Sequence, residues 1–206
     1  MSSVVRTAVL VHAIGRTPAS MLLLAGRLRR AGVKCHLFGY AATFESFDRI
    51  TARLAARLQR VASERYIAIG HSLGGVLLRA ALTELPQDVR RPDHLFLIGS
   101  PSRSPRLAQK LRRWWPYRFI HGDCGQLLAD SKRMDALPDA AVPTTVIAGT
   151  RGWRGQRGPF AADENDGVVA VSEVELRELP VVRLPEWHTF LMNSGQLFEL
   201  IRRHLQ

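Results

Sequence analysis

The amino-acid sequence predicts a single-domain α/β fold, with about six mostly parallel strands and helices on both faces of the sheet. Three observations lead to this prediction. The chain has 206 residues, the usual length of one domain. Short apolar runs alternate with helical segments along the chain, which is the order of a parallel α/β sheet. No repeat, linker or low-complexity tract marks off a second domain.

The predicted strands are short apolar runs of the kind that is buried on both faces of a parallel sheet. They cover Ala8–His12, Lys34–Phe38, Tyr66–Gly70, His94–Ile98, Thr144–Ala148 and Val181–Leu184. Their alternation with helical segments predicts a parallel sheet with helices on both sides.

Helices are predicted between the strands. The first has Thr17 as N-cap, Pro18 at its first position and Gly32 past its end. A third helix follows Ser72, and the last runs from about Gly195 to Leu205. The second helix carries an apolar stripe at three- and four-residue steps, formed by Phe44, Phe47, Ile50, Leu54, Leu58 and Val61.

The segment at about 102–143 departs from this alternation because it is longer than a crossover helix requires. We therefore expect a lid or cap insertion there. Its basic residues lie beside aromatic ones, a composition that suits an anionic membrane surface contacted through Arg112, Arg113, Trp114 and Trp115. The same pattern also fits a helix whose aromatic side chains cover the core while its arginines are solvated.

The net charge is +11, and only three of the 29 basic residues are lysines. Such a surface attracts anions, or simply serves solubility. No recognition motif for nucleic acid is present, so no nucleic-acid partner is expected. The start of the chain lacks the pattern of a secretory leader, and no apolar run reaches the ~20 residues of a membrane span, so a cytoplasmic location is expected. Cys35 and Cys124 are interpreted as free thiols.

Residues 70–75, Gly-His-Ser-Leu-Gly-Gly, follow a predicted strand and precede a predicted helix. A Gly-x-Ser-x-Gly sequence in this context is typical of a nucleophile elbow, a tight turn that lifts the Ser72 hydroxyl above the sheet edge. Gly70 and Gly74 lack side chains, so strand and helix can approach each other there. The neighbouring His71 is interpreted as structural.

A serine nucleophile needs a histidine base and a carboxylate that orients it. His188 lies after the last predicted strand and is the expected base, while His121 and His204 lie in less suitable positions. Asp166, in the turn Asn165-Asp166-Gly167, is the expected acid, with Asp163 and Glu164 as close rivals. The backbone N–H of Leu73 is expected to be one oxyanion donor.

These motifs resemble those of the small α/β-hydrolase serine esterases and lipases, in particular the minimal bacterial lipases. Val11-His12-Ala13-Ile14-Gly15 is similar to their oxyanion loop, residues 70–75 to their elbow, and Asn165–Val169 with His188 to their acid and base turns. The resemblance implies an α/β-hydrolase fold and a second oxyanion donor, the backbone N–H of Ile14. Ala13 replaces the family's glycine, which would introduce strain if that position requires a positive φ.

The resemblance further implies a serine carboxylester hydrolase, an esterase or lipase, that acts on a small-molecule or lipid ester through an acyl-enzyme on Ser72, Asp166 and His188. This chemistry needs no metal or organic cofactor. The same residues also fit a thioesterase or acyltransferase, and an inactive hydrolase-like binding protein would share the fold.

Overall fold

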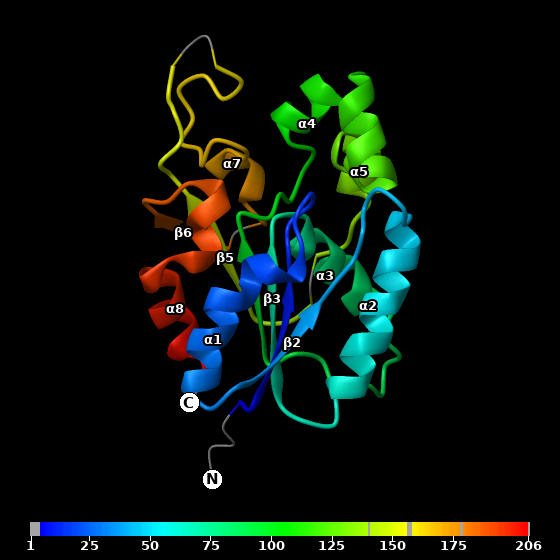
Figure 1. Cartoon of the computed structure of the whole chain (residues 1–206), viewed down its shortest axis with the longest axis vertical. Helices are drawn as coiled ribbons and strands as arrows, with labels where there is room; N and C mark the ends of the chain where they lie inside the picture. The colour runs from blue at the N-terminus through cyan, green and yellow to red at the C-terminus, as the bar shows by residue number, and fades with distance from the viewer. Residues whose placement is uncertain (1–4, 140, 156–157, 178, 206) are drawn as a thin grey trace.

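A computed structural model of the chain describes residues 5–139, 141–155, 158–177 and 179–205. Within these residues one sheet of six strands runs through the molecule in the order β2-β1-β3-β4-β5-β6, and every pair of neighbours is parallel (Figure 1). The strands are β1 (Thr7–Val11), β2 (Lys34–Phe38), β3 (Tyr66–His71), β4 (His94–Ile98), β5 (Thr144–Gly149) and β6 (Val181–Leu184). The predicted α/β class and all six predicted strands are confirmed, with ends that differ by at most one residue.

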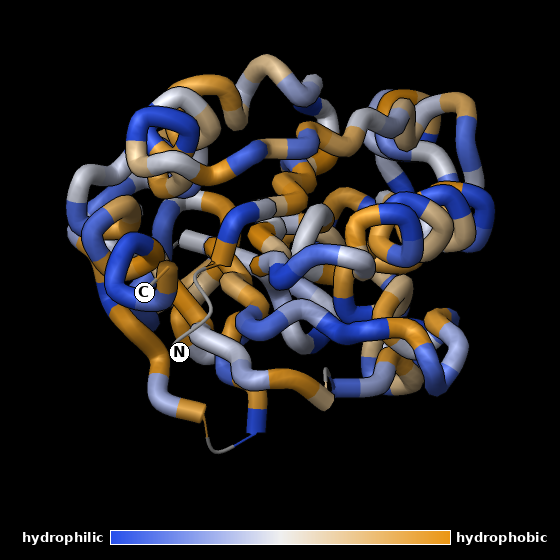
Figure 2. Tube along the Cα trace, turned by 90° about the horizontal axis from the view of Figure 1, so that it is seen from below, coloured by the Kyte–Doolittle hydropathy of each residue, from blue (hydrophilic) through white to orange (hydrophobic). Residues whose placement is uncertain are grey.

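Helices cover both faces of the sheet. On one face lie α2 (Phe47–Val61) and α3 (Leu73–Thr83), and on the other lie α1 (Leu22–Arg30) and α8 (Gly195–Arg202). Alternate strand residues face opposite ways, so Leu97 packs with the first pair of helices and Phe96 with the second. Seen from below, hydrophobic segments are frequent through the middle of the molecule, while hydrophilic and hydrophobic residues alternate along the outer helices (Figure 2).

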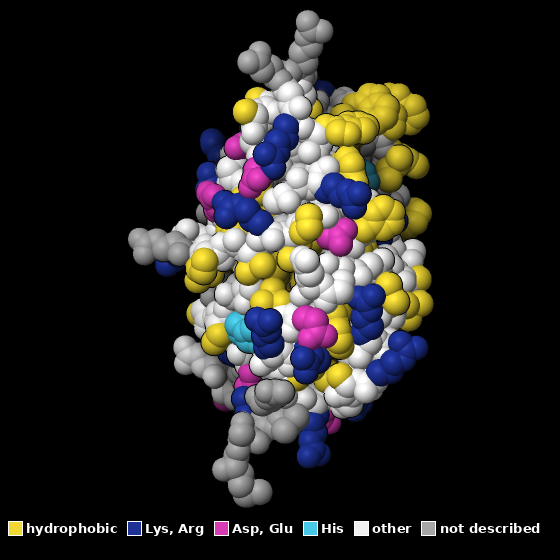
Figure 3. Space-filling view, turned by 90° about the vertical axis from the view of Figure 1, so that its left-hand side faces the viewer, with side chains coloured by type: hydrophobic (Ala, Val, Ile, Leu, Met, Phe, Trp, Pro, Cys, Tyr) yellow, Lys and Arg dark blue, Asp and Glu magenta, His cyan; other side chains and the backbone are white. Residues whose placement is uncertain are grey.

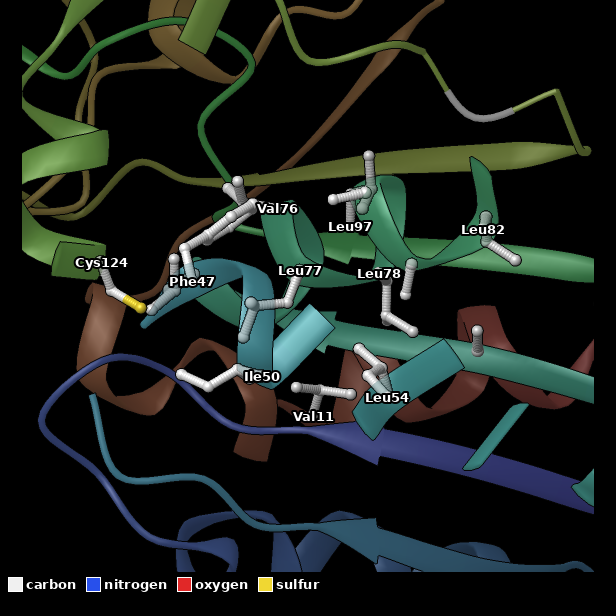
Figure 4. Close-up of a cluster of buried hydrophobic side chains, with 14 of the residues drawn as sticks. Val11, Phe47, Ile50, Leu54, Val76, Leu77, Leu78, Leu82, Leu97 and Cys124 are labelled. Atoms are coloured by element: carbon white, nitrogen blue, oxygen red, sulfur yellow. The ribbon is translucent and has the colours of Figure 1, made fainter. Parts of the chain in front are cut away.

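The core between α2, α3 and the sheet holds the elbow helix in place. Figure 4 shows the side chains of α2 and α3 meeting those of the central strands, among them Val11, Ile50, Leu54, Leu77, Leu78 and Leu97. Nearly every residue of α3 is buried, from Leu73 to Leu82. The start of this helix is therefore fixed relative to the ends of β1 and β3.

One predicted helix boundary was wrong, the inclusion of Phe44 in the second helix, whereas Thr17 and Pro18 stand at the start of the first helix as predicted. Phe44 does not belong to the apolar stripe of α2: it precedes the helix, whose N-cap Ser46 accepts a hydrogen bond from the Arg49 N–H, and it is 85% exposed. The first helix begins as a 3-10 turn, η1 (Pro18–Met21), and becomes α-helical at Leu22. Thr17 is extended but its side chain makes no capping hydrogen bond.

The segment between β4 and β5 folds into α4 (Arg106–Leu111), α5 (Trp115–Leu128) and α6 (Ser131–Asp135). Gly122 interrupts α5 with φ 51° and ψ −143°, and a side chain there would meet the Ala42 carbonyl oxygen. The interpretation in which aromatic side chains cover the core holds for Tyr117, whereas Trp115 and Phe119 are exposed. In the part of the chain that the structure describes, no helix combines the length and apolar character of a membrane span.

The short elements α7 (Val171–Val174) and η2 (His188–Asn193) lie after β5 and β6. In α7 the Glu173 carboxylate accepts a hydrogen bond from the Ala170 N–H at 2.9 Å. The same side chain accepts hydrogen bonds from the backbone and the guanidinium of Arg106, at the start of α4. This buried carboxylate thus ties the insertion to the loop that follows β5.

Candidate active site

Ser72 lies at the sharp turn between β3 and α3. Its backbone has φ 54° and ψ −122°, a conformation that non-glycine residues rarely adopt. The Ser72 N–H donates to the Ile98 carbonyl at 2.8 Å, so the turn is fastened to the end of β4. Strained residues of this kind persist only where the surrounding structure holds them, and they concentrate at functional sites.

The glycines of the elbow are required by backbone packing. A Cβ atom on Gly70 would lie 2.4 Å from the Cα of Gly75, and one on Gly74 would lie 2.3 Å from the carbonyl oxygen of Val11. Neither neighbour is a side chain that could rotate away. The close approach of α3 to β1 and β3 therefore depends on the absence of these two side chains.

His188 and Asp166 form a buried pair at the ends of β6 and β5. The His188 Nδ1 lies 2.6 Å from Asp166 Oδ2, and the His188 backbone N–H donates to the Asp166 carbonyl at 2.9 Å. The other carboxylate oxygen accepts hydrogen bonds from the backbone N–H groups of Val168 and Val169, at 2.9 and 2.8 Å. The carboxylate is thus held in one orientation toward the imidazole.

The rival acids make other contacts. Asp163 accepts hydrogen bonds from the Arg106 guanidinium and the Ser172 hydroxyl, and Glu164 pairs with Arg154 and Arg183. Neither acid contacts His188 among the described residues. Of these three neighbouring acids, only Asp166 points toward the predicted base.

Gly99, at the end of β4, connects the serine to this pair. The residue before it accepts the Ser72 N–H, and a Cβ on Gly99 would lie 3.1 Å from His188 Nδ1 and 3.3 Å from Asp166 Oδ2. Ser72 and His188 therefore lie at the same edge of the sheet, both 6% exposed. Among the described residues the Ser72 hydroxyl makes no hydrogen bond to His188. Sequence reasoning missed Gly99, although a glycine directly after a predicted strand was a visible signal.

The side chain of His71 contacts the backbone of the loop that carries His188. Its Nε2 lies 3.0 Å from the His188 backbone carbonyl and must carry the proton in order to donate to that oxygen. The two imidazole rings are tilted, with centroids 4.9 Å apart. Burial holds the pKa of His71 well below its usual range, with a further contribution from His188. A neutral His71 thus positions the loop that carries His188.

The predicted oxyanion loop is held by His12. Burial lowers the pKa of His12, its Nδ1 lies 2.8 Å from the Ala13 carbonyl, and its ring stacks on Tyr40 with centroids 4.2 Å apart. Within the described chain the only non-glycine residues with positive φ are Ser72, Ala161 and Arg177, so Ala13 introduces no strain of that kind. The turn places its positive φ of 66° on Gly15.

The backbone N–H groups of Ile14 and Leu73 are available to a ligand. In the described part of the chain neither donates a hydrogen bond to a protein acceptor. Leu73 is the first residue of α3, where N–H groups have no partner within the helix. Ile14 is half-buried and packs against the core of the α3 face. Free donors at this edge are what a developing oxyanion requires.

Burial also lowers the pKa of His94, to about 4, with His204 as the second cause. An unfolded histidine has a pKa near 6.5, so the unfolded chain binds more protons than the folded chain below that pH. The free energy of unfolding is therefore expected to have its full value above about pH 6.5 and to decrease toward pH 4. Each histidine whose pKa is lowered by folding contributes at most ~1.4 kcal/mol per pH unit to this decrease. Urea unfolding at pH 7.5, 5.5 and 4.5 measures this slope. His94→Gln should flatten it, and an unchanged slope would contradict the assignment.

No protein-family model matches the chain, and no curated protein matches it in sequence. Solved structures do match in fold. An esterase from Exiguobacterium antarcticum has a TM-score of 0.68 at 14% identity, covering 98% of this chain and 92% of its own. An extracellular α/β-hydrolase from a Paenibacillus species has a TM-score of 0.64 at 14% identity, covering 96% of this chain and 98% of its own. The Vlm2 thioesterase domain has a TM-score of 0.60 at 19% identity, covering 97% and 92%. The chain therefore has the α/β-hydrolase fold.

Proposed function

We propose that the protein is a serine hydrolase that cleaves carboxylic esters through an acyl-enzyme. The observation that carries the proposal is the buried pair of His188 and Asp166 beside a serine held at a strained elbow, with two unengaged backbone donors at the same sheet edge. The fold neighbours named esterase and α/β-hydrolase support a hydrolase of this class.

In the proposed reaction the Ser72 hydroxyl oxygen attacks the carbonyl carbon of the ester. His188 Nδ1–H donates to Asp166, so Nε2 is the nitrogen that accepts the serine proton. The negative charge that develops on the carbonyl oxygen is stabilised by the N–H groups of Leu73 and Ile14. The tetrahedral intermediate collapses, the alcohol leaves with the proton from His188, and Ser72 keeps the acyl group.

Deacylation repeats these steps with water as the nucleophile. His188 accepts a proton from the water, whose oxygen attacks the acyl carbon, and returns it to Ser72 as the carboxylic acid leaves. Whenever His188 is protonated, the negative charge of Asp166 stabilises the imidazolium. Two backbone N–H groups bind the second oxygen of Asp166 and hold the carboxylate in the orientation that this requires. His71 fixes the backbone of His188, so the imidazole needs little reorganisation during the cycle.

Initial rates on p-nitrophenyl esters from acetyl to palmitoyl test the proposal. We expect ester turnover that is lost by at least about a thousandfold in His188→Gln, because a triad member acts only with its partners. His36→Gln, a histidine on the edge strand β2, is the matched control and should keep full turnover. Turnover at no chain length, or turnover that survives His188→Gln, would contradict the proposal.

A matched thioester series distinguishes the second candidate. The thioesterase among the fold neighbours favours including this series, and the first half of its reaction would use the same residues. A rate constant kcat/KM that is more than tenfold higher for thioesters than for oxygen esters would assign the protein as a thioesterase. Reaction with a fluorophosphonate probe separates either enzyme from an inactive binding protein.

A further inference from the structure

The insertion exposes a group of large hydrophobic side chains together with the loop beside it. Thr43 Oγ1 donates to the Ile120 carbonyl at 2.6 Å, which places the Thr43–Phe44 loop against α5. We call this group the aromatic rim: Phe44 (85% exposed), Trp114 (57%), Trp115 (74%), Phe119 (72%) and Ile120 (50%). Trp115 and Phe119 are four residues apart and share one face of the helix. Exposed apolar groups of this size mark interaction surfaces.

An arginine-lined hollow of about 530 Å³ adjoins the rim. Its lining consists of Arg112, Arg113, Arg118, Gln126, Ala129, Asp130 and Arg133. Arg133 pairs with Asp123 at 2.8 Å, and Asp130 accepts hydrogen bonds from the Lys132 and Arg133 backbone at the start of α6.

The other three arginines of the hollow have no such partner in the part of the chain that the structure describes. Arg112, Arg113 and Arg118 are exposed, and within the described residues none of them pairs with a carboxylate. With four arginines and one acid, Asp130, in its lining, the hollow has an excess of positive charge among the described residues. Guanidinium groups match phosphate oxygens in both charge and geometry.

We propose that this surface docks the protein on an anionic phospholipid bilayer. The arginine hollow receives lipid phosphate groups, while the aromatic rim enters the interface, where tryptophan rings are favoured. A second copy of the chain on the same surface would oppose arginines to arginines. A nucleic acid supplies phosphates but no apolar phase for Ile120 and Phe44. A bilayer satisfies both halves of the surface.

The surface borders the candidate active site. A Cβ on Gly15, in the oxyanion loop, would lie 3.3 Å from the ring of His121, which follows Ile120 in α5. Figure 3, which faces the side of the molecule that carries β6 and α8 in Figure 1, shows hydrophobic side chains gathered toward its upper right. If the proposed function holds, docking turns the site toward acyl chains in the bilayer; the docking itself does not depend on that function.

Co-sedimentation with vesicles tests the docking surface. The probes are vesicles of phosphatidylcholine alone and vesicles that contain about a third phosphatidylglycerol. We expect little binding to the uncharged vesicles and strong binding to the anionic ones. Each arginine near an anionic surface contributes about fivefold, so the variant R112Q/R113Q/R118Q should bind about a hundredfold more weakly. The matched control R30Q/R60Q/R90Q removes the same charge from exposed positions that precede β2, β3 and β4, at the other edge of the sheet. It should retain most of the binding.

A second variant, W115A/F119A, tests the rim without a charge change. Both side chains are exposed, so the fold is expected to persist, and binding to the anionic vesicles should fall at least tenfold. The proposal would be overturned if both arginine variants lost vesicle binding to the same extent, or if the natural sequence did not bind vesicles. It would also be overturned if the protein bound an oligonucleotide more tightly than the anionic vesicles. Turnover of a soluble ester is measured on the same samples. A variant that loses vesicle binding but keeps ester turnover supports the docking surface. If no sample, the natural protein included, turns over the ester, the result contradicts the proposed function and leaves the docking result unaffected.

Discussion

Replacement of Ser72 by alanine is expected to lower ester turnover by about 10⁵-fold while the protein stays folded. The Ser72 hydroxyl is the proposed nucleophile, and without it the proposed acyl-enzyme cannot form on this residue. The change removes one oxygen from a side chain that makes no hydrogen bond to His188 among the described residues. Initial rates on the best p-nitrophenyl ester, together with thermal unfolding, measure both effects.

The matched control for this variant is Ser63→Ala, an exposed serine between α2 and β3. It should keep full turnover and full labelling by a fluorophosphonate probe, whereas Ser72→Ala should lose both. Turnover within tenfold of the natural protein in Ser72→Ala would exclude Ser72 as the nucleophile. The search would then move to other serines at the same edge, of which Ser100 is buried.

The largest effect on stability is expected from Gly74→Ala. Its Cβ would lie 2.3 Å from the Val11 carbonyl oxygen and 2.7 Å from that of His12, so the first turn of α3 must move away from β1. Because both obstacles are backbone, the cost is expected to exceed ~3 kcal/mol. For a chain of this size the melting temperature should fall by about 10 °C.

Gly26→Ala provides the opposite case. Gly26 lies inside α1, and no atom outside that helix lies within 4 Å of the position that its Cβ would take. An alanine there is expected to stabilise the protein by ~0.5–1 kcal/mol, because it restricts the unfolded chain and favours the helix. Calorimetry on both variants distinguishes the steric clash expected at position 74 from the helix-favouring effect expected at position 26. Equal melting temperatures for them would contradict the close packing of α3 against β1.

Most of the fold could be predicted from the pattern of apolar residues, because a strand that is buried on both faces of a sheet must be a short apolar run. The candidate site was harder to predict. Order along the chain placed Asp166 and His188 on adjacent loops, but Asp163 and Glu164 have the same chemistry and the same turn context. Only the three-dimensional contacts separate them: two loop N–H groups and an imidazole surround one carboxylate, while arginines take the other two.

Other features left no local signal. Phe44 continues the helical spacing of α2, yet Ser46 begins the helix after it, so an apolar residue at the right step lies in solvent. The contact between His71 and the His188 carbonyl joins residues 117 positions apart, and no pattern near either one announces it. Trp115 is 74% exposed although it lies in a helix with Tyr117, which is buried, and the spacing of aromatic residues does not distinguish the two.

The sheet order has a consequence for biosynthesis. Ser72 follows the central strand β3, whereas its proposed partners come from the last third of the chain and the predicted oxyanion loop from its beginning. A nascent polypeptide therefore carries the proposed nucleophile long before it carries the proposed base, and we expect it to be inactive until β6 has paired with β5. Enzymatic activity in such a protein reports completion of the whole sheet, and a truncation that removes only the final strand and helix should abolish it as surely as the loss of the serine.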